Sequence, residues 1–141
     1  MVAEEIKFLN IAKEVLIAAP ADVVFQTVLE PHGPMKEMNM KLEPWPGGRW
    51  FRDLGNNTGH LWGHVQVIKP PKLLELVGPT MMSYPAISHI QYRLTEQPGG
   101  TLLKFTHRAM GLIAADLELG VTKGWGEMLE QIRAAAERKR G

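Results

Sequence analysis

Among the five histidines of the chain, His107 is the one best placed to do chemistry. It alternates with Leu103 and Phe105, a pattern that predicts a strand with one buried face. A buried neutral imidazole can act as a general base or bind a polar group of a ligand. It can equally be a core residue that a neighbouring side chain satisfies. A catalytic role would also need a partner carboxylate or a substrate, and the sequence identifies neither.

Two further histidines, His60 and His64, lie four residues apart in a segment that reads as a strand. Strand geometry separates such side chains by about 13 Å, too far for them to hold one metal ion together. The more apolar face of this strand is predicted to face the core. One face would carry His60, Trp62, His64 and Gln66, and the apolar face Leu61, Val65 and Val67. A bulge near Gly63 would reverse this assignment over part of the strand, and that alternative stays open.

The sequence lacks the motifs of several common reactions. Its 141 residues contain no cysteine, which excludes disulfides, thiolate catalysis and cysteine metal ligands. There is no Gly-x-Ser-x-Gly nucleophile pattern, and Gly47 and Gly48 do not lead into a helix as a phosphate-binding loop requires. We therefore predict no metal, no cofactor and no assigned catalytic residue, and we favour a protein that is not an enzyme.

Charge and hydropathy limit the partners and the location. A formal net charge of +1 argues against a nucleic-acid surface, and 45% apolar with 22% charged residues is typical of a globular protein. No segment is long enough to span a bilayer, and residues 1–10 lack the basic start and apolar run of a signal peptide. We expect one domain over residues 1–141, located in the cytoplasm and not inserted into a membrane.

The last thirty residues carry the clearest structural signal. A helix would place six residues on one apolar stripe: Val121, Trp125, Met128, Leu129, Ile132 and Ala136. Such a stripe needs a broad apolar partner, so Trp125 is either the wall of a cavity or an anchor of the core. Gly124 and Gly126 flank the tryptophan, and we expect them to let neighbouring backbones approach the indole.

The order of elements predicts an α+β fold. Strands are expected over residues 11–18, 49–54, 58–68, 72–77, 87–96 and 101–110. Helices are expected from residue 20 to 30 and from residue 112 to the end, and a break of the second near Gly120 stays open as an alternative. Residues 32–46 read as irregular, with room for a short helical turn and an edge strand. The alternating strands supply an apolar face on which the C-terminal helix can lie.

Five strings, in order along nearly the whole chain, carry a family resemblance. They are residues 19–25 (APADVVF), 46–50 (PGGRW), 63–74, 100–108 and the Gly124-Trp125 pair with Leu129. With them the chain resembles the SRPBCC superfamily of helix-grip, START-like domains, and most closely the activator of heat-shock-protein-ninety ATPase homologue family. Family members usually carry a tryptophan after the second helix, where this chain has Pro-Met-Lys-Glu-Met at residues 34–38.

The resemblance implies a curved antiparallel sheet of six to seven strands wrapped around the long C-terminal helix, with two short helices after the first strand. It also implies an apolar cavity between sheet and helix. The predicted lining is Trp50, Tyr92, Leu94, Leu103, Phe105, His107, Trp125 and Leu129. Flexible thioethers suit an adaptable entrance, and we assign that role to Met35, Met38, Met81 and Met82.

Three functions follow as hypotheses. The first is non-enzymatic binding of a small hydrophobic or aromatic molecule in the cavity. The second is a cyclase-like or hydrolase-like enzyme that uses His107 for proton transfer. The third is a co-chaperone-like or stress-response module that binds a protein partner through its surface. The chain is expected to be a monomer or a weak dimer, and a shared fold alone does not choose among the three functions.

Overall fold

The computed structural model describes residues 5–80 and 85–139. Its strands are β1 (Lys7–Ile17), β2 (Met40–Leu42), β3 (Arg49–Gly55), β4 (Thr58–Lys69), β5 (Leu73–Gly78), β6 (Ala86–Gln97) and β7 (Gly100–Gly111). Its helices are α1 (Ala21–Val28), α2 (Pro34–Glu37) and α3 (Leu117–Lys139). The seven strands form one antiparallel sheet in the order β1-β7-β6-β5-β4-β3-β2. The predicted α+β helix-grip fold is confirmed.

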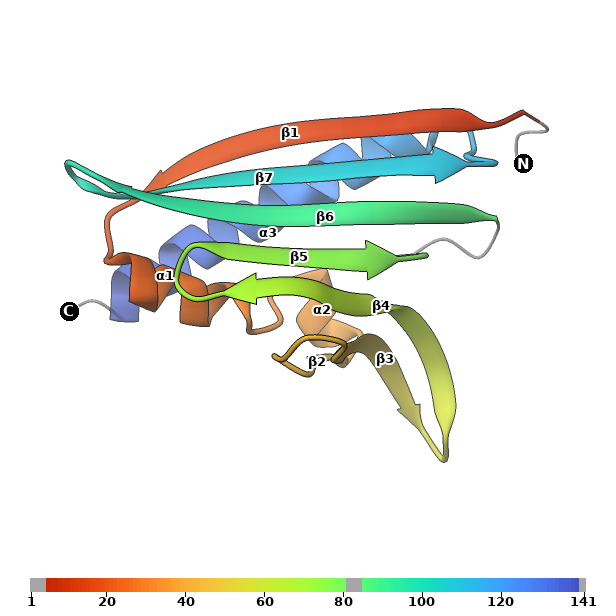
Figure 1. Ribbon diagram of the computed structural model, residues 1–141, viewed down its shortest axis with the longest axis horizontal. Coiled ribbons are helices and arrows are strands. Elements are labelled where there is room, and N and C mark those ends of the chain that lie inside the picture. Colours follow the sequence, from red (N-terminus) through yellow and green to blue (C-terminus); the bar gives the residue numbers. More distant parts are fainter. Residues whose placement is uncertain (1–4, 81–84, 140–141) are drawn as a thin grey trace.

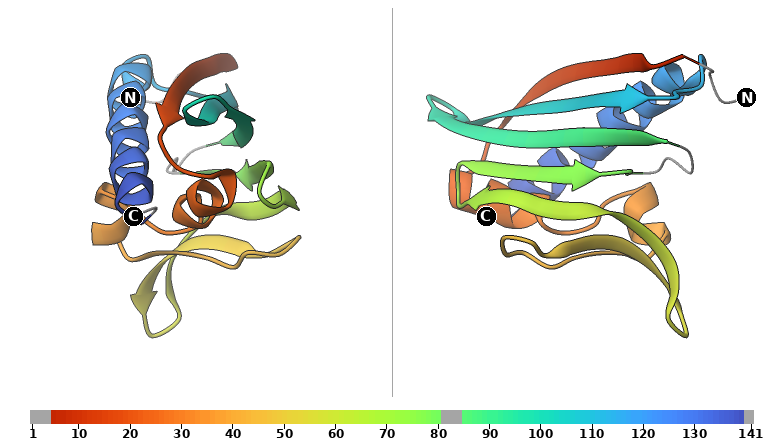
Figure 2. Two further views of the ribbon diagram at one scale, coloured as in Figure 1. Left: turned by 90° about the vertical axis from the view of Figure 1, so that its left-hand side faces the viewer. Right: turned by 45° about the vertical axis from the view of Figure 1, so that its right-hand side comes forward.

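The sheet and α3 form two layers, and the short helices lie toward one edge (Figures 1 and 2). In Figure 1 the long helix runs behind the sheet, and β3 and β4 extend away from the rest as a hairpin. The connection from β1 into α1 is held by α3, because the Ala18 amide donates to Glu137 Oε2 at 2.9 Å. This bond fixes the end of β1 and the start of α1 against the C-terminal helix.

The buried residues of α3 are the six predicted from the sequence: Val121, Trp125, Met128, Leu129, Ile132 and Ala136. The helix begins at Leu117 rather than at residue 112, and it continues through Gly120 without a break. Leu112 instead extends the sheet's hydrogen bonding, because its amide donates to the Pro85 carbonyl. Burial of the stripe outweighs the poor helix propensity of glycine, so the predicted break is wrong.

The remaining elements match their predictions within one to four residues at most ends. The stretch after α1 contains the expected short helix and edge strand, α2 and β2. Asn56 and Asn57 both have positive φ, which is the conformation that a tight turn between β3 and β4 requires. The predicted helix to residue 30 ends earlier, at Val28.

The predicted faces of β4 are wrong for Trp62 and Leu61. Trp62 is buried at 6% exposure, whereas Leu61 is 46% exposed. The cause is a bulge: Trp50 pairs with Gly63 and Phe51 with Leu61, so that Trp62 is an extra residue without a partner on β3. An extra residue reverses which side chains face inward. The alternative that a bulge near Gly63 changes the assignment is the correct one.

Close backbone approach accompanies the bulge on the side of β5. A Cβ on Gly78 would lie 2.4 Å from both the Gly63 Cα and the Trp62 carbonyl oxygen. Only glycine therefore fits at position 78 if β5 is to pair with the bulged strand. Trp62 then packs edge to face on Trp50, with ring centroids 5.1 Å apart.

If the stripe of α3 holds the two layers together, Ile132→Ala should lower the free energy of unfolding by about 2–5 kcal/mol. Ile132 is 1% exposed, so the substitution leaves a cavity between layers. Leu119→Ala is the matched control, because Leu119 lies on the same helix and is 81% exposed. Its effect should stay within about 0.5 kcal/mol. Urea unfolding measures both, and equal effects would contradict the assigned packing.

Candidate functional site

A chain of buried hydrogen bonds joins α3 to two central strands. The Trp125 indole Nε1–H donates to Nδ1 of His107 at 2.9 Å. The His107 ring then bonds through Nε2 to the Ser88 hydroxyl at 2.8 Å. His107 and Ser88 are 0% and 2% exposed. The inward-facing side chains of Ser88 on β6 and His107 on β7 thus bond to each other, and the second ring nitrogen of His107 bonds to Trp125 of α3.

The hydrogen bonds fix the protonation of His107. An indole nitrogen can only donate, so Nδ1 must be the acceptor and the ring proton must lie on Nε2. Nε2 therefore donates to Ser88, and no ring lone pair is left to accept a proton from a substrate. Burial lowers the pKa of His107 to about 4. The neutral core histidine considered in the sequence analysis is the arrangement that this geometry supports.

Aromatic packing completes the setting of Trp125. Its ring lies 5.0 Å from that of Phe105 and 5.7 Å from that of His107 by centroids. Phe105 packs in turn on Tyr92 at 5.0 Å. The Tyr92 hydroxyl donates to the sulfur of Met128, and burial raises the pKa of this hydroxyl. The indole is consequently held in one orientation from both its polar and its apolar side.

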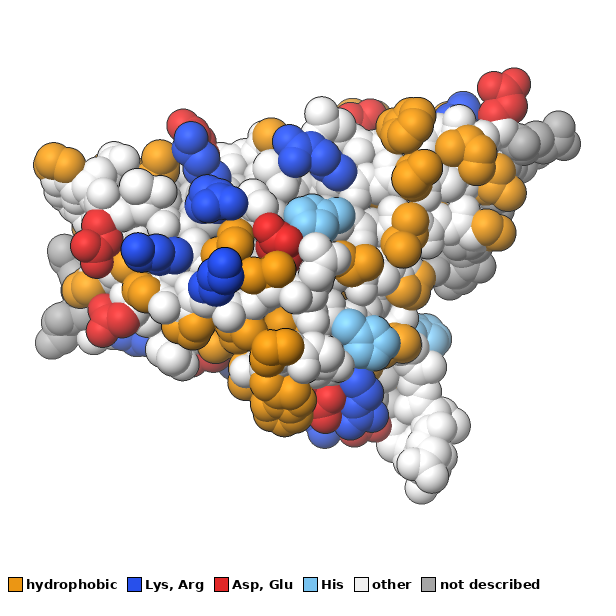
Figure 3. Space-filling model, in the orientation of Figure 1, with side chains coloured by type: hydrophobic (Ala, Val, Ile, Leu, Met, Phe, Trp, Pro, Cys, Tyr) orange, Lys and Arg blue, Asp and Glu red, His pale blue; other side chains and the backbone are white. Residues whose placement is uncertain are grey.

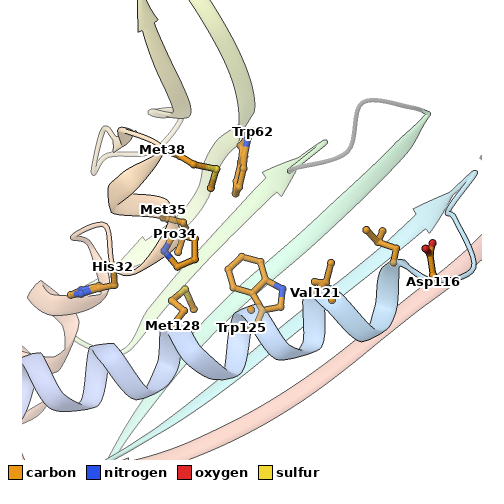
Figure 4. A pocket seen from close by; sticks show the side chains of 12 residues that line it. His32, Pro34, Met35, Met38, Trp62, Asp116, Val121, Trp125 and Met128 are labelled. Carbon is orange, nitrogen blue, oxygen red and sulfur yellow. The ribbon is translucent and has the colours of Figure 1, made fainter. Parts of the chain in front are cut away.

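Beside this braced indole lies an apolar pocket of about 460 Å³, open between α2, β4 and the first half of α3. Figure 4 shows Met38 and Trp62 facing Val121, Trp125 and Met128 across it. The full lining is His32, Pro34, Met35, Met38, Trp62, Asp116, Leu117, Gly120, Val121, Gly124, Trp125 and Met128. The Nε2 of His32 lies 2.7 Å from the Thr27 carbonyl oxygen, which engages that ring nitrogen. The lining therefore offers mainly ring faces, thioethers and aliphatic surface.

The structure brings only part of the predicted cavity set to this pocket. Trp125, Met35 and Met38 line it. Trp50 and Tyr92 lie at a separate, much smaller space of about 30 Å³. The other predicted lining residues, Leu94, Leu103, Phe105, His107 and Leu129, are in the core and at most 4% exposed. Met81 and Met82 lie outside the described residues.

Residues outside the predicted lining supply much of the wall. Met128 and Val121 are predicted as buried residues of the helix but not as cavity residues, and the predicted strand face puts Trp62 on the opposite side. The apolar periodicity of α3 contained the signal for the first two. For Trp62 the signal was weaker, because only the open alternative of a bulge pointed to it.

The explanation predicted for the two glycines is wrong. A Cβ on Gly124 would meet no atom of the described residues within 4 Å. A Cβ on Gly126 would meet only the side chain of Lys13, at an ordinary 3.6 Å. No neighbouring backbone therefore approaches α3 at these positions, and the space above Gly124 belongs to the pocket.

The described residues contain no group of three or more His, Cys, Asp or Glu side chains that could hold a metal ion. Over the same residues, no helix is both long enough and apolar enough to cross a membrane.

The sheet, the gripped helix and the pocket between them define the class of protein. This chain belongs to the family described as Activator of Hsp90 ATPase homolog 1-like protein, whose model matches residues 18–137. The family predicted from the five sequence strings is thereby confirmed. No protein of the curated set matches the chain.

Solved structures share the fold at low sequence identity. An uncharacterised protein from Rhizobium leguminosarum is 20% identical with a TM-score of 0.74, and the match covers 95% of this chain and 97% of that one. CalU16 from Micromonospora echinospora is 21% identical with a TM-score of 0.63, over 92% and 81% of the two chains. DynU16, from the dynemicin biosynthetic locus, is 16% identical with a TM-score of 0.67, over 93% and 48%. At these identities the likeness shows the fold alone.

The buried histidine makes stability depend on pH in a defined direction. The folded protein prefers the neutral ring, because the pKa falls from 6.5 to about 4 on folding. This contribution is fully present above pH 6.5 and is lost as the pH falls toward 4. Between pH 7 and pH 4.5 it should amount to roughly 2–3 kcal/mol. Urea unfolding of the wild type at the two pH values measures the loss.

His107→Gln is the control, because glutamine does not titrate and carries both an acceptor and a donor. Carboxylates that titrate in the same range affect both proteins equally. The wild type should lose roughly 2–3 kcal/mol more than the variant over this range. Parallel losses in both proteins would show that His107 is not held neutral in the core.

Proposed function

We propose that the protein binds a small apolar molecule in the pocket between α2, β4 and α3. The observation that carries this proposal is a lining of tryptophan, methionine and aliphatic side chains around about 460 Å³ of open space. Ligand pockets in proteins typically occupy roughly 300–1,000 Å³ and are mostly apolar. An apolar space of this size that opens to solvent favours an occupant, because its filling removes apolar surface from water.

Two kinds of wall suit the pocket to binding. Trp125 is fixed by His107 and Phe105, and Trp62 by Trp50, so neither indole has to be ordered when a ligand arrives. Walls that are ordered in advance reduce the entropic cost of binding. Methionine side chains, by contrast, adapt to the shape of the molecule that enters. This combination supports a small hydrophobic or aromatic ligand.

The enzyme hypothesis loses its main candidate. His107 does not line the pocket, and Trp125 occupies the lone pair that a general base needs. We therefore favour binding without catalysis by His107. The cysteine-free composition is compatible with the reducing cytoplasm, where we expect the protein to act.

A second candidate is binding of a protein partner through the outer face of the sheet. There Phe8, Met110 and Ile87 stand side by side on β1, β7 and β6, at 78%, 48% and 52% exposure. Figure 3 shows hydrophobic side chains gathered over this end of the three strands. The three side chains border a hollow of about 520 Å³ on this face. Among the described residues that line it, Phe8 supplies the one benzene or indole ring, and Arg108, His89 and Gln66 are also in its lining, so we place it second for a small apolar ligand.

Titration with the neutral fluorescent probe N-phenyl-1-naphthylamine tests the pocket. Met38→Glu puts a charge among apolar groups and should weaken probe binding by at least about tenfold. Met110→Glu is the same substitution on the outer face and should leave binding unchanged. Fluorescence of the probe gives the dissociation constants, and circular dichroism confirms that both variants fold.

The pattern of the two variants decides between the surfaces. Loss of binding in Met110→Glu but not in Met38→Glu would place the probe on the outer face and contradict the pocket proposal. Absence of saturable binding to the wild type would also contradict it.

A further inference from the structure

The wall that α3 gives the pocket contains two glycines in the interior of a continuous helix. Gly120 and Gly124 are one turn apart, and both line the pocket. A glycine in a helix interior weakens the helix relative to alanine. Neither position needs glycine for packing, because a Cβ there would meet no atom of the described residues within 4 Å. The folded chain thus has no described contact that explains these two residues.

The missing side chains have a consequence for the pocket. Any larger residue at position 120 or 124 would project its side chain into the space that Trp125 and Met128 border. Without them, a strip of helix backbone is open to a ligand, and a molecule can lie closer to α3 than side chains would allow. A strip that is open along one helical turn fits a flat molecule better than a globular one.

The other walls favour the same shape. Trp125 and Trp62 present rings that are fixed in position, by the hydrogen bond to His107 and by the edge-to-face contact with Trp50. Fixed aromatic rings gain most from a second aromatic ring in stacked or edge-to-face contact. Thioether sulfur also packs favourably on aromatic rings, and Met35, Met38 and Met128 all line the pocket.

We propose that the pocket selects a planar aromatic ring system, which lies along α3 over Gly120 and Gly124 and packs on Trp62 and Trp125. This inference rests on the proposed function and specifies the class of its ligand. Gly124 is then a specificity-determining residue: its lack of a side chain makes the room in which the ring lies. His32 and Asp116 are the lining side chains that could meet a polar substituent at the rim.

A matched pair of ligands tests the class. The probes are 2-naphthol and decahydro-2-naphthol, which share the bicyclic skeleton and the hydroxyl group but differ in planarity and aromaticity. Protein labelled with ¹³C at the methionine methyl groups reports on the pocket through Met35, Met38 and Met128, and on the outer face through Met110. The wild type should bind 2-naphthol about tenfold more tightly than decahydro-2-naphthol, and the methyl resonances of the three pocket methionines should shift.

Two glycine variants test the position of the ring. Gly124→Ala adds one methyl group to the open strip, and it should weaken 2-naphthol binding about tenfold. It should also raise the melting temperature by roughly 2–4 °C, because alanine favours the helix. Gly126→Ala is the matched control, since Gly126 does not line the pocket and faces Lys13 of β1. It should raise the melting temperature similarly and leave binding unchanged.

The outcomes separate this inference from the proposal on which it rests. Equal affinity for the two probes, with shifts at the pocket methionines, would overturn the aromatic class while supporting a general apolar pocket. Undiminished 2-naphthol binding in Gly124→Ala would overturn the placement over α3. Absence of shifts at Met35, Met38 and Met128 with both probes would overturn the inference together with the proposed function.

Discussion

The hydrogen bond from Trp125 to His107 is the interaction on which the rest of the structure depends. It joins α3 to β7, and through Ser88 to β6, inside a core where an unpaired donor would be costly. Because the indole can only donate, the bond also selects the neutral tautomer of the histidine. One contact thus fixes the helix on the sheet, removes His107 from proton chemistry and orients the ring that forms a wall of the pocket.

The second constraint is the bulge that turns Trp62 inward. Without it, the parity of β4 would put this indole on the outer face, and the pocket would lose the wall opposite Trp125. Close backbone approach at Gly78 on β5 accompanies the bulge, since a Cβ there would clash with the carbonyl of Trp62 itself. The binding surface therefore arises where a local irregularity of the sheet meets a regular helix, and α2 adds its methionines from a third direction (Figure 4).

The sequence predicts the fold well because periodicity reports directly on burial. The six-residue stripe of α3 and the alternation around Leu103 and Phe105 identify the inward faces without further knowledge. Periodicity does not report whether the space between two inward faces is filled. Leu94, Leu129 and Phe105 belong to the predicted cavity lining, yet they pack into the core, and the open space lies nearer α2. Whether the space is filled depends on the side-chain volumes of three separate elements together, so the pattern of one segment cannot predict it.

Intermolecular nuclear Overhauser effects between bound N-phenyl-1-naphthylamine and the labelled protein test directly whether a ligand lies beside the Trp125 ring that His107 holds. We expect contacts from the probe to the indole protons of Trp62 and Trp125 and to the methyl group of Met128. We also expect the Trp125 indole N–H resonance to persist in the complex, because its bond to His107 stays in place. Contacts to Phe8, Met110 and Ile87 alone, or to none of these residues, would contradict this placement of the ligand.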